Sequence, residues 1–397
     1  MAEVHSFRRV LIVADESADW MVAGLRQLDR LALSVDEFAI ENKETAPVVI
    51  CIFWRRDLDE LQRWVPTSER LTMVAFTTDL DGEPFDLVLN TRLFLYRKAM
   101  RHLLEESIPS AEITSSPGEP ELWERYFAQA RSFPRSREGG WEYILDGGQI
   151  DEIETRFLRG TGKSQDGFVS RFLNRPISRI MTRLLLRFPT TPNAWTLLIF
   201  PIPILASLVL LQGTYWSFLW GLILFQVFSI LDGCDGEIAR AKFLESERGR
   251  RLDDLFDIFS NMLLAVGLGF GLARQATLPG RSGWFYLIEG GLAAGLIAVN
   301  EFLLATQKQT GAEEKPDSLG GVLYPRHREL VERSGLLLLG KKAAFWLIQL
   351  TKRDVAVLFF VFLAAIGRPA WILHLLFGVT AVSLALALKS SFRACTE

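Results

Sequence analysis

The feature that most constrains this chain is a change in its composition near residue 190. Before this point, charged residues and turn residues are mixed along the sequence, whereas after it long runs of Leu, Phe, Ala and Gly follow one another. A run of about 20 apolar residues is long enough to cross a bilayer as a helix. We predict six transmembrane helices, at residues 194–212, 217–238, 254–274, 284–306, 342–367 and 370–388.

The fifth run is short in its purely apolar part, VAVLFFVFLAAIG, which follows Lys352, Arg353 and Asp354. Charged side chains are costly at the centre of a bilayer. We therefore expect the preceding segment, KAAFWLIQL, to lie at the membrane interface and to lead into the span.

Basic residues near the ends of the runs predict the orientation of the chain. Lys and Arg occur before the first run, in the loop RAKFLESERGRR, in the connection 307–352 and in the C-terminal KSSFRACTE. The alternate loops are short and carry fewer basic residues. Because basic loops are retained in the cytoplasm, we expect an inner-membrane or plasma-membrane protein whose N-terminal half, aspartate-rich turn and C-terminus are cytoplasmic.

Composition excludes some partners. The 44 Lys and Arg residues are nearly balanced by 47 Asp and Glu residues, for a formal net charge of -3, so we expect no nucleic acid to bind. Cys51, Cys234 and Cys395 lie far apart without metal or redox spacing, and we expect free thiols. The N-terminal MAEVHSFRRVLIVAD has no apolar core before its charges, so we expect no signal peptide.

The first part of the chain has the pattern of an α/β domain. Between residues 9 and 89, the strand-like runs RVLIVAD, VVICIFW, LTMVAF and FDLVLN alternate with amphipathic stretches. This alternation favours a parallel, Rossmann-like sheet, which binds ligands beyond the carboxyl ends of its strands. We therefore divide the chain into a soluble α/β domain at 1–150, a linker with a basic amphipathic helix at 151–190, and an α-helical integral membrane domain at 191–397.

The linker contains an arginine at every fourth position of the segment DGFVSRFLNRPISRIMTRLLLRF, with apolar residues between the arginines. A helix with this pattern can lie among lipid headgroups with its arginines near phosphates. It is therefore either an electrostatic membrane anchor or, in addition, a place where Arg175 or Arg179 binds a substrate that carries phosphate.

Four aspartates stand where the second apolar run ends and the third begins, in LDGCDGEIARAKFLESERGRRLDDLFD. Asp232 and Asp235 are three residues apart and Asp253 and Asp257 are four apart, so each pair lies on one helical face. Four converging carboxylates would repel one another in a partly dry site. A divalent cation with oxygen ligands, Mg²⁺ or Mn²⁺, resolves this repulsion.

Small residues accompany these aspartates. Gly236 and Ala239 leave room for a bulky ligand beside the carboxylates, and Gly249 suits a turn or a close helix contact. Arg240 offers a fixed fork of donors to a phosphate. The sequence therefore predicts a site for a metal together with a phosphate-bearing ligand.

Together these residues form the pattern D-x2-D-G-x2-A-R-x8-G-x3-D-x3-D, which the chain matches at every position. This pattern is the signature of the CDP-alcohol phosphotransferase family, and the chain resembles that family over roughly residues 166–397. Eight residues at fixed spacing are far more specific than a lone glycine motif. The resemblance implies a membrane enzyme with six transmembrane helices that forms a homodimer.

The resemblance also implies roles for single residues. In this family the aspartates hold one or two divalent metals that bind the diphosphate of a CDP-linked donor, and the last of them, here Asp257, deprotonates the acceptor hydroxyl. The implied metal ligands are Asp232, Asp235, Asp253 and Asp257. The implied CDP-binding residues are Asp232, Gly236, Ala239, Arg240 and Gly249. The implied reaction is an in-line attack by the acceptor on the donor's β-phosphorus, with release of CMP.

Two further residues are candidates to bind the acceptor. Arg353 opens the fifth run on the cytoplasmic side and can bind an acceptor phosphate. Glu301 falls near the cytoplasmic end of the fourth run, close to the expected depth of the aspartates, and can contact a substrate. The basic residues Arg175, Arg179 and Arg353 together favour an acceptor that carries phosphate, such as inositol phosphate or glycerol phosphate.

The order of elements in the α/β domain resembles the nucleotidyltransferase-like domains that some membrane alcohol phosphotransferases carry at their N-terminus. Those domains have a glycine-rich loop after the first strand, whereas this chain has ADESADWMVAGL, whose acids would repel phosphate. Asn90 stands after the fourth strand, where an acidic metal ligand is expected. We therefore interpret the domain as a degenerate scaffold that supports or regulates the membrane domain.

Three functions compete. The leading one is a transferase of phospholipid biosynthesis that moves a phosphatidyl group from CDP-diacylglycerol to a polar alcohol or alcohol phosphate. In the second, a small soluble CDP-alcohol is the donor and a lipid or inositol phosphate is the acceptor. The third, outside this class, is a membrane protein or transporter that binds divalent metal without catalysis; a transporter would place polar residues near the midplane of several spans, whereas here they gather at one face.

Overall fold

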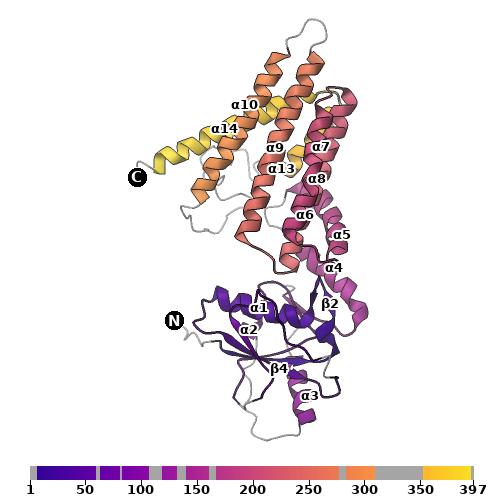
Figure 1. The fold of residues 1–397 in the computed structure, drawn as a ribbon, viewed down its shortest axis with the longest axis vertical. Coiled ribbons are helices and arrows are strands. Elements are labelled where there is room, and N and C mark those ends of the chain that lie inside the picture. The colour runs from indigo at the N-terminus through magenta and orange to yellow at the C-terminus, as the bar shows by residue number, and fades with distance from the viewer. Residues whose placement is uncertain are drawn as a thin grey trace, which may run out of the picture. The chain divides into compact units, whose positions relative to one another are not determined.

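The computed structural model describes residues 7–59, 63–80, 83–106, 119–131, 140–160, 167–276, 283–308 and 352–394. The chain divides into two compact units (Figure 1). Unit 1 comprises residues 1–160 with the short segments 186–189 and 240–243, and unit 2 comprises residues 161–185, 190–239 and 244–397. Each unit is described by itself below.

A four-stranded parallel sheet forms the centre of unit 1. Its strands stand in the order β5-β4-β1-β6, and they pair in parallel, with Ile12 of β1 opposite Ile52 of β4 and Leu89 of β6. The strands are β1 (Arg9–Ala14), β4 (Val48–Trp54), β5 (Val74–Thr77) and β6 (Leu87–Asn90). All four strand-like runs of the sequence are therefore strands, and the predicted parallel α/β sheet is confirmed.

Alternation along the strands gives this sheet two apolar faces. Val10 and Ile12 of β1 face a core that α1 (Gln27–Glu41) covers, while Leu11 and Val13 face a second core that α3 (Glu119–Ala130) covers. Side chains of a strand point to opposite faces in turn, so a run without polar residues is buried on both sides. The continuous apolar character of RVLIVA thus has a physical reason.

Smaller elements complete unit 1. Two antiparallel two-stranded sheets form, a hairpin of β2 and β3 and a pairing of β7 with β8, which are far apart in the sequence. The remaining elements are β2 (Met21–Val22), β3 (Leu25–Arg26), β7 (Leu93–Leu95), β8 (Trp141–Tyr143), α2 (Met100–Glu106) and α4 (Ile150–Gly160), with 3-10 turns at Glu16–Asp19 and Gly147–Gln149.

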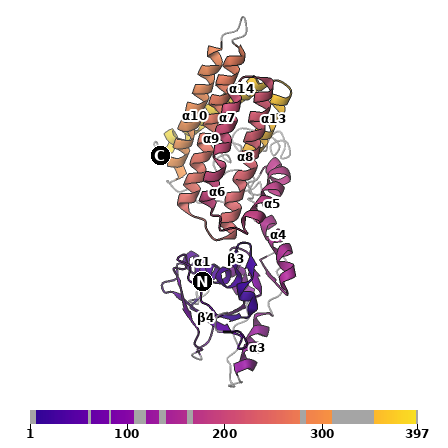
Figure 2. The ribbon, with the colours of Figure 1, turned by 45° about the vertical axis from the view of Figure 1, so that its right-hand side comes forward.

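Unit 2 is a bundle of helices (Figures 1 and 2). A π-helical turn, Ser170–Asn174, leads into α5 (Arg175–Leu185). The other helices are α6 (Pro192–Ile199), α7 (Pro201–Leu210), α8 (Tyr215–Ala241), α9 (Glu247–Ala276), α10 (Trp284–Lys308), α13 (Arg353–Ala365) and α14 (Pro369–Ala394). Its main apolar core is built from side chains of α7, α8, α9, α13 and α14.

Length and composition identify spans within the described part of the chain. Four helical stretches there are long and apolar enough to cross a membrane: Pro192–Leu210, Tyr215–Ala241, Glu247–Ala276 and Trp284–Phe302. They coincide with the first four predicted runs. Pro369–Ala385 is a shorter apolar helix, and the predicted fifth run lies partly outside the described residues, so the count of six stays a prediction.

Proline divides the first span into two helices. α6 ends at Ile199 and α7 begins at Pro201, with Phe200 between them. The ring of a proline removes a backbone donor and clashes with the preceding turn, so it interrupts a helix. The N-terminus of α6 is capped by Thr191, whose hydroxyl accepts from the amide of Ala194 at 3.3 Å. The span therefore begins at a defined residue and is interrupted at Phe200.

Candidate active site

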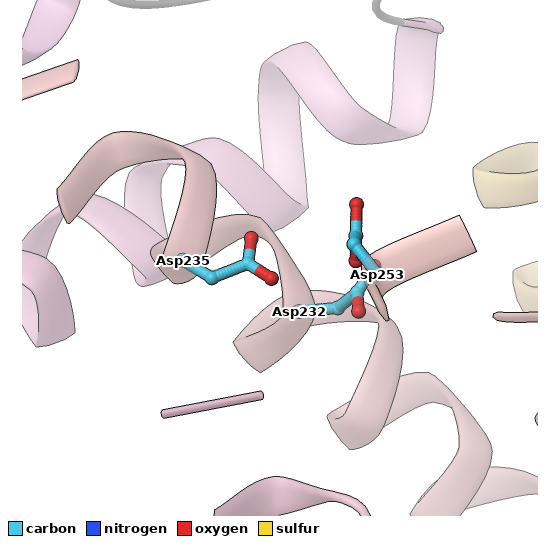
Figure 3. Close-up of side chains that lie close together, drawn as sticks. All are labelled: Asp232, Asp235 and Asp253. Carbon is cyan, nitrogen blue, oxygen red and sulfur yellow. The ribbon is translucent and has the colours of Figure 1, made fainter. Parts of the chain in front are cut away.

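The turn between α8 and α9 brings three aspartates together. Asp232 and Asp235 lie on the last turns of α8, and Asp253 lies on the first turns of α9. One carboxylate oxygen from each lies within 4.8 Å of the other two, and the side chains converge from the two helices (Figure 3). Carboxylate oxygens at such distances are the ligands that a hard divalent cation takes. The residues therefore fit the metal site that the sequence predicts.

Asp235 is held in place by neutral donors. It is 9% exposed, and it accepts hydrogen bonds from the Thr196 hydroxyl at 2.8 Å and from the amide of Gly236. Neither donor cancels its charge, while two more carboxylates lie close by. Like charges in a partly buried place are unfavourable without a cation. The surroundings of Asp235 thus add to the argument for a bound metal.

Asp257 is not one of these three and pairs instead with an arginine. One α-helical turn after Asp253, its carboxylate forms an ion pair with Arg353, the first residue of α13. Arg353 also lies 3.9 Å from a carboxylate oxygen of Asp232 and donates to the Ser260 hydroxyl at 3.4 Å. The guanidinium of Arg353 therefore connects Asp257 and Asp232 to α13.

The small residues of the pattern lie along the same two helices. Ala239 is 8% exposed on α8, and Arg240 follows it in the last turn. A side chain at Gly249, in the first turn of α9, would come within 2.9 Å of the Asn193 amide oxygen and 3.0 Å of the Ser246 hydroxyl. Gly249 therefore allows the start of α9 to approach the start of α6, the helix that carries Thr196.

Comparison with known proteins decides the family. Residues 189–388, just over half of the 397-residue chain, match the family described as CDP-alcohol phosphatidyltransferase. The chain belongs to this family. The family predicted from the aspartate pattern is confirmed, and the four spans of a membrane family make the chain an integral membrane protein and, by family, a CDP-alcohol phosphotransferase.

Several curated relatives carry the name bifunctional IPC transferase and DIPP synthase. The protein from Thermococcus kodakarensis is 43% identical over 100 residues, which are 25% of this chain and 21% of that protein. The protein from Rubrobacter xylanophilus is 40% identical over 134 residues, 33% of this chain and 30% of that protein. The protein from Archaeoglobus fulgidus is 34% identical over 121 residues, 30% of this chain and 23% of that protein. The chain thus spans less than a third of the length of the curated relatives that it matches.

The other residues predicted to bind the acceptor in this family member, Arg175, Arg179 and Glu301, have surroundings that differ from those of Arg353. Arg175 is 7% exposed on α5, and its guanidinium lies 3.0 Å from a carboxylate oxygen of Glu237 on α8. Arg179 is half-buried one turn further along α5, and Glu301 is half-buried on α10. Arg353, by contrast, forms an ion pair with Asp257 and lies 3.9 Å from a carboxylate oxygen of Asp232.

Residues that the sequence reasoning did not single out also surround the site. Glu237 lies next to Gly236 on α8 and is fully buried. Thr196 of α6 donates to Asp235, and Ser260 of α9 accepts from Arg353. The charge of Glu237 inside an apolar run is a signal that sequence reasoning could have used, because buried acids are expected to have partners. Thr196 and Ser260 are uncharged, so nothing comparable in the sequence marks them as part of the site.

The carboxyl edge of the sheet in unit 1 has its own acids, and arginines accompany them. Asp15 is 1% exposed, and the guanidinium of Arg92 donates to its carboxylate at 2.7 Å. Glu16 pairs with Arg92 at 2.7 Å and with Arg55 at 3.0 Å. Asn90, fully buried at the end of β6, accepts from the Arg92 amide at 3.1 Å. The edge at which a parallel sheet binds ligands thus carries ion pairs between its acids and arginines.

Proposed function

We propose that this chain transfers a substituted phosphate group from a CDP-linked alcohol to the hydroxyl of an acceptor alcohol or alcohol phosphate, with release of CMP. The observation that carries the proposal is the approach of Asp232, Asp235 and Asp253 to within 4.8 Å at the end of two membrane-length helices. Arg353 pairs with Asp257 and lies 3.9 Å from Asp232, and this cation beside the cluster supports binding of a second substrate next to the first. Membership of the CDP-alcohol phosphatidyltransferase family supports the reaction class.

Each aspartate has a role in this proposal. Asp232, Asp235, Asp253 and Asp257 hold Mg²⁺ or Mn²⁺, which offsets negative charge on the transferred phosphate and on the leaving oxygen. Asp257 also takes the proton of the acceptor hydroxyl as its oxygen forms the new bond to phosphorus and the bond to CMP breaks. Its place beside Arg353 supports this role, because a cationic side chain next to the base can hold an anionic acceptor.

The other residues of the pattern form the donor site in this proposal. Gly236 and Ala239 leave space for the cytidine on α8, and Arg240 contacts a phosphate. Gly249 keeps the start of α9 close to α6, so that Asp253 stays opposite α8. Arg353 binds the phosphate of the acceptor through charge-assisted hydrogen bonds. Arg175, Arg179 and Glu301 are the further candidates for the acceptor site, and Arg175 pairs with the buried Glu237.

Two kinds of donor remain candidates. A site at the end of membrane-length helices supports a lipid donor, CDP-diacylglycerol, in the bilayer, which would make this an enzyme of phospholipid biosynthesis. The description of the matched family as a phosphatidyltransferase also supports this donor. The second candidate is a small soluble CDP-alcohol. A comparison of donors decides between them.

We also propose six spans, a cytoplasmic N-terminal half and active site, and a homodimer in the inner or plasma membrane. The basic loops support the orientation. On α10, Gly291 and Gly295 form a G-x-x-x-G pattern with open space beside both, flanked by the exposed side chains of Ile288, Leu292 and Val299. Such faces bring membrane helices together, which supports a dimer.

For unit 1 we propose a scaffold that does not bind nucleotide. The ion pairs of Asp15 and Glu16 with Arg92 and Arg55 support this role, because a nucleotide phosphate would have to displace them. The carboxylates would also repel the phosphate.

The test is CMP release by the purified protein in lipid, with CDP-diacylglycerol or with soluble CDP-alcohols such as CDP-inositol and CDP-glycerol. The acceptors are inositol phosphate, glycerol phosphate and their uncharged alcohols, each with and without Mg²⁺. We expect acceptor-dependent and metal-dependent CMP release that is lost in Asp257→Ala. Absence of CMP with every donor and acceptor, from protein that binds Mg²⁺, would refute the transferase and favour metal binding without catalysis.

A further inference from the structure

The helix α5 and the turn before it have an unusual distribution of polar residues. Their exposed side is apolar: Phe172 is 70% exposed and Ile180 is 74% exposed. Their buried side is polar and consists of Asn174, Arg175, Ser178 and Thr182. These four positions recur with the spacing of one helical face. An apolar exposed side suits lipid, so the buried polar side requires partners inside the protein.

Glu237 of α8 is the main partner. Its side chain is fully buried, and one carboxylate oxygen accepts from the Arg175 guanidinium at 3.0 Å and from the Ser178 hydroxyl at 2.9 Å. The second oxygen accepts from the Thr182 hydroxyl at 2.7 Å. Both oxygens of the Glu237 carboxylate are therefore hydrogen-bonded to side chains on two turns of α5.

The backbone of α8 fits the same contact. The Arg175 guanidinium donates to the carbonyl of Gly233 at 3.3 Å, and a side chain at Gly233 would come within 3.2 Å of that guanidinium. The Gln226 amide donates to the Asn174 side chain at 2.9 Å, further along the same face. Three turns of α8 are thus joined to the polar side of α5 and its preceding turn.

The geometry of a helix separates this contact from the aspartates. Successive residues are about 100° apart around an α-helix, so Glu237 lies about 140° from Asp232 and roughly 160° from Asp235. One side of α8 therefore faces α5 while another carries the ligands toward Asp253. A helix held by hydrogen bonds at two points along its length cannot rotate about its axis without breaking them.

We infer that Glu237 is a positioning residue: through Arg175, Ser178 and Thr182 it fixes the rotation of α8, and so aims Asp232 and Asp235 at Asp253. Buried ion pairs add little net stability compared with apolar contacts, but they require one arrangement of their partners. The inference rests on the metal site proposed above. It assigns to α5 a function in the site that differs from binding the acceptor.

The experiment measures Mn²⁺ affinity by electron paramagnetic resonance in full-length protein in lipid, at a temperature where each variant is folded. Glu237→Ala is compared with Glu289→Ala, which also removes a buried carboxylate. Glu289 lies on α10 and pairs with His374 of α14 at 2.7 Å. If loss of any buried acid in the bundle weakened the metal site, both variants would show it.

We expect Glu237→Ala to weaken Mn²⁺ binding about tenfold or more, in the range found when groups that orient metal ligands are removed, and Glu289→Ala to bind as wild type does. The kcat should fall while the KM for the acceptor changes little. The milder variants Ser178→Ala and Thr182→Val, which keep the ion pair, should weaken Mn²⁺ binding by smaller factors. They decide the question if Glu237→Ala does not fold.

Wild-type Mn²⁺ affinity in folded Glu237→Ala, or in both milder variants if that protein does not fold, would overturn the positioning role and leave the proposed function intact. Equal losses in the Glu237 and Glu289 variants would also overturn it. Absence of Mn²⁺ binding in the wild type would instead overturn the metal site itself, and the inference with it. The two failures are therefore distinguishable.

Discussion

Carboxylates gather at the ends of strands in unit 1 and at the ends of helices in unit 2, but their partners differ. In unit 1, Asp15 and Glu16 meet the guanidinium of Arg92 at 2.7 Å from each. In unit 2, the aspartates at the α8–α9 turn meet one another, within 4.8 Å. Among the described donors to Asp235 are a hydroxyl and a backbone amide, both neutral.

The two groups of acids differ in the partners that offset their negative charge. Asp15 and Glu16 each have an arginine partner at 2.7 Å, which offsets their charge without a metal ion. At the α8–α9 turn Arg353 lies beside Asp257 and Asp232, while three carboxylates gather within 4.8 Å and Asp235 accepts from neutral donors, an arrangement that favours a further cation. The comparison therefore predicts that variants of the α8–α9 cluster affect metal binding and catalysis, whereas variants of the Asp15 network affect the stability of unit 1.

The largest effect is expected for Asp253→Asn, which removes one of the three clustered carboxylates. Rates of CMP release should fall roughly a thousandfold or more, because metal ions supply several kcal/mol of charge stabilisation in such reactions. The matched control is Asp254→Asn. Asp254 is the next residue, half exposed, and pairs with Arg250 at 2.9 Å. Its rate should stay within about twofold of wild type; equal losses in both variants would break the comparison.

Arg353→Ala tests whether the cation beside Asp257 serves the acceptor. For an acceptor that carries phosphate, kcat/KM should fall about 10- to 100-fold, since a hydrogen bond to a charged group contributes roughly 1.5–3 kcal/mol. For an uncharged acceptor the loss should be smaller. Arg368→Ala, at the exposed end beyond α13, is the control. Equal losses with both kinds of acceptor would show that Arg353 does not recognise the acceptor phosphate.

In unit 1, Arg92→Ala should lower stability and leave the metal site intact. It removes a donor from buried Asp15, which should cost about 1–3 kcal/mol of local stability. Hydrogen exchange of the β1 and β6 amides, read by mass spectrometry, measures this loss. Arg26→Ala removes an arginine from a half-exposed pair with Asp19 and should change exchange little. Loss of Mn²⁺ binding in Arg92→Ala would contradict the separation of the two networks.

The smallest effect is expected when CTP is added to the wild-type protein. If ion pairs fill the carboxyl edge of the sheet, exchange of the turn from Asp15 to Trp20 should not change with CTP. Slower exchange confined to this turn would show that unit 1 binds nucleotide after all. The proposed scaffold role would then be wrong.

The sequence was sufficient to predict the four strands and the first four spans. It predicted that Asp232, Asp235, Asp253 and Asp257 converge, and the structure gathers Asp232, Asp235 and Asp253 within 4.8 Å, with Asp257 paired to Arg353. The periodicity of the strands and spans and the spacing of the aspartates are local properties of the chain, and the spacing of the aspartates is unusually specific. The pairing of Asp257 with Arg353 could not be predicted, because these residues are far apart in the sequence and nothing local relates them. For the same reason, the arginine stripe of α5 indicated a charged helix but not which arginine is buried. Arg175 is the residue that pairs with Glu237.

The most direct test of the account is a Mn²⁺ titration, followed by electron paramagnetic resonance, of the wild-type protein and of Asp253→Asn and Asp15→Asn in lipid. The account predicts that the wild type and Asp15→Asn bind Mn²⁺ equally and that Asp253→Asn loses the site, because the acids of unit 1 already have arginine partners. Unchanged Mn²⁺ binding in Asp253→Asn, or its loss in Asp15→Asn, would contradict the account.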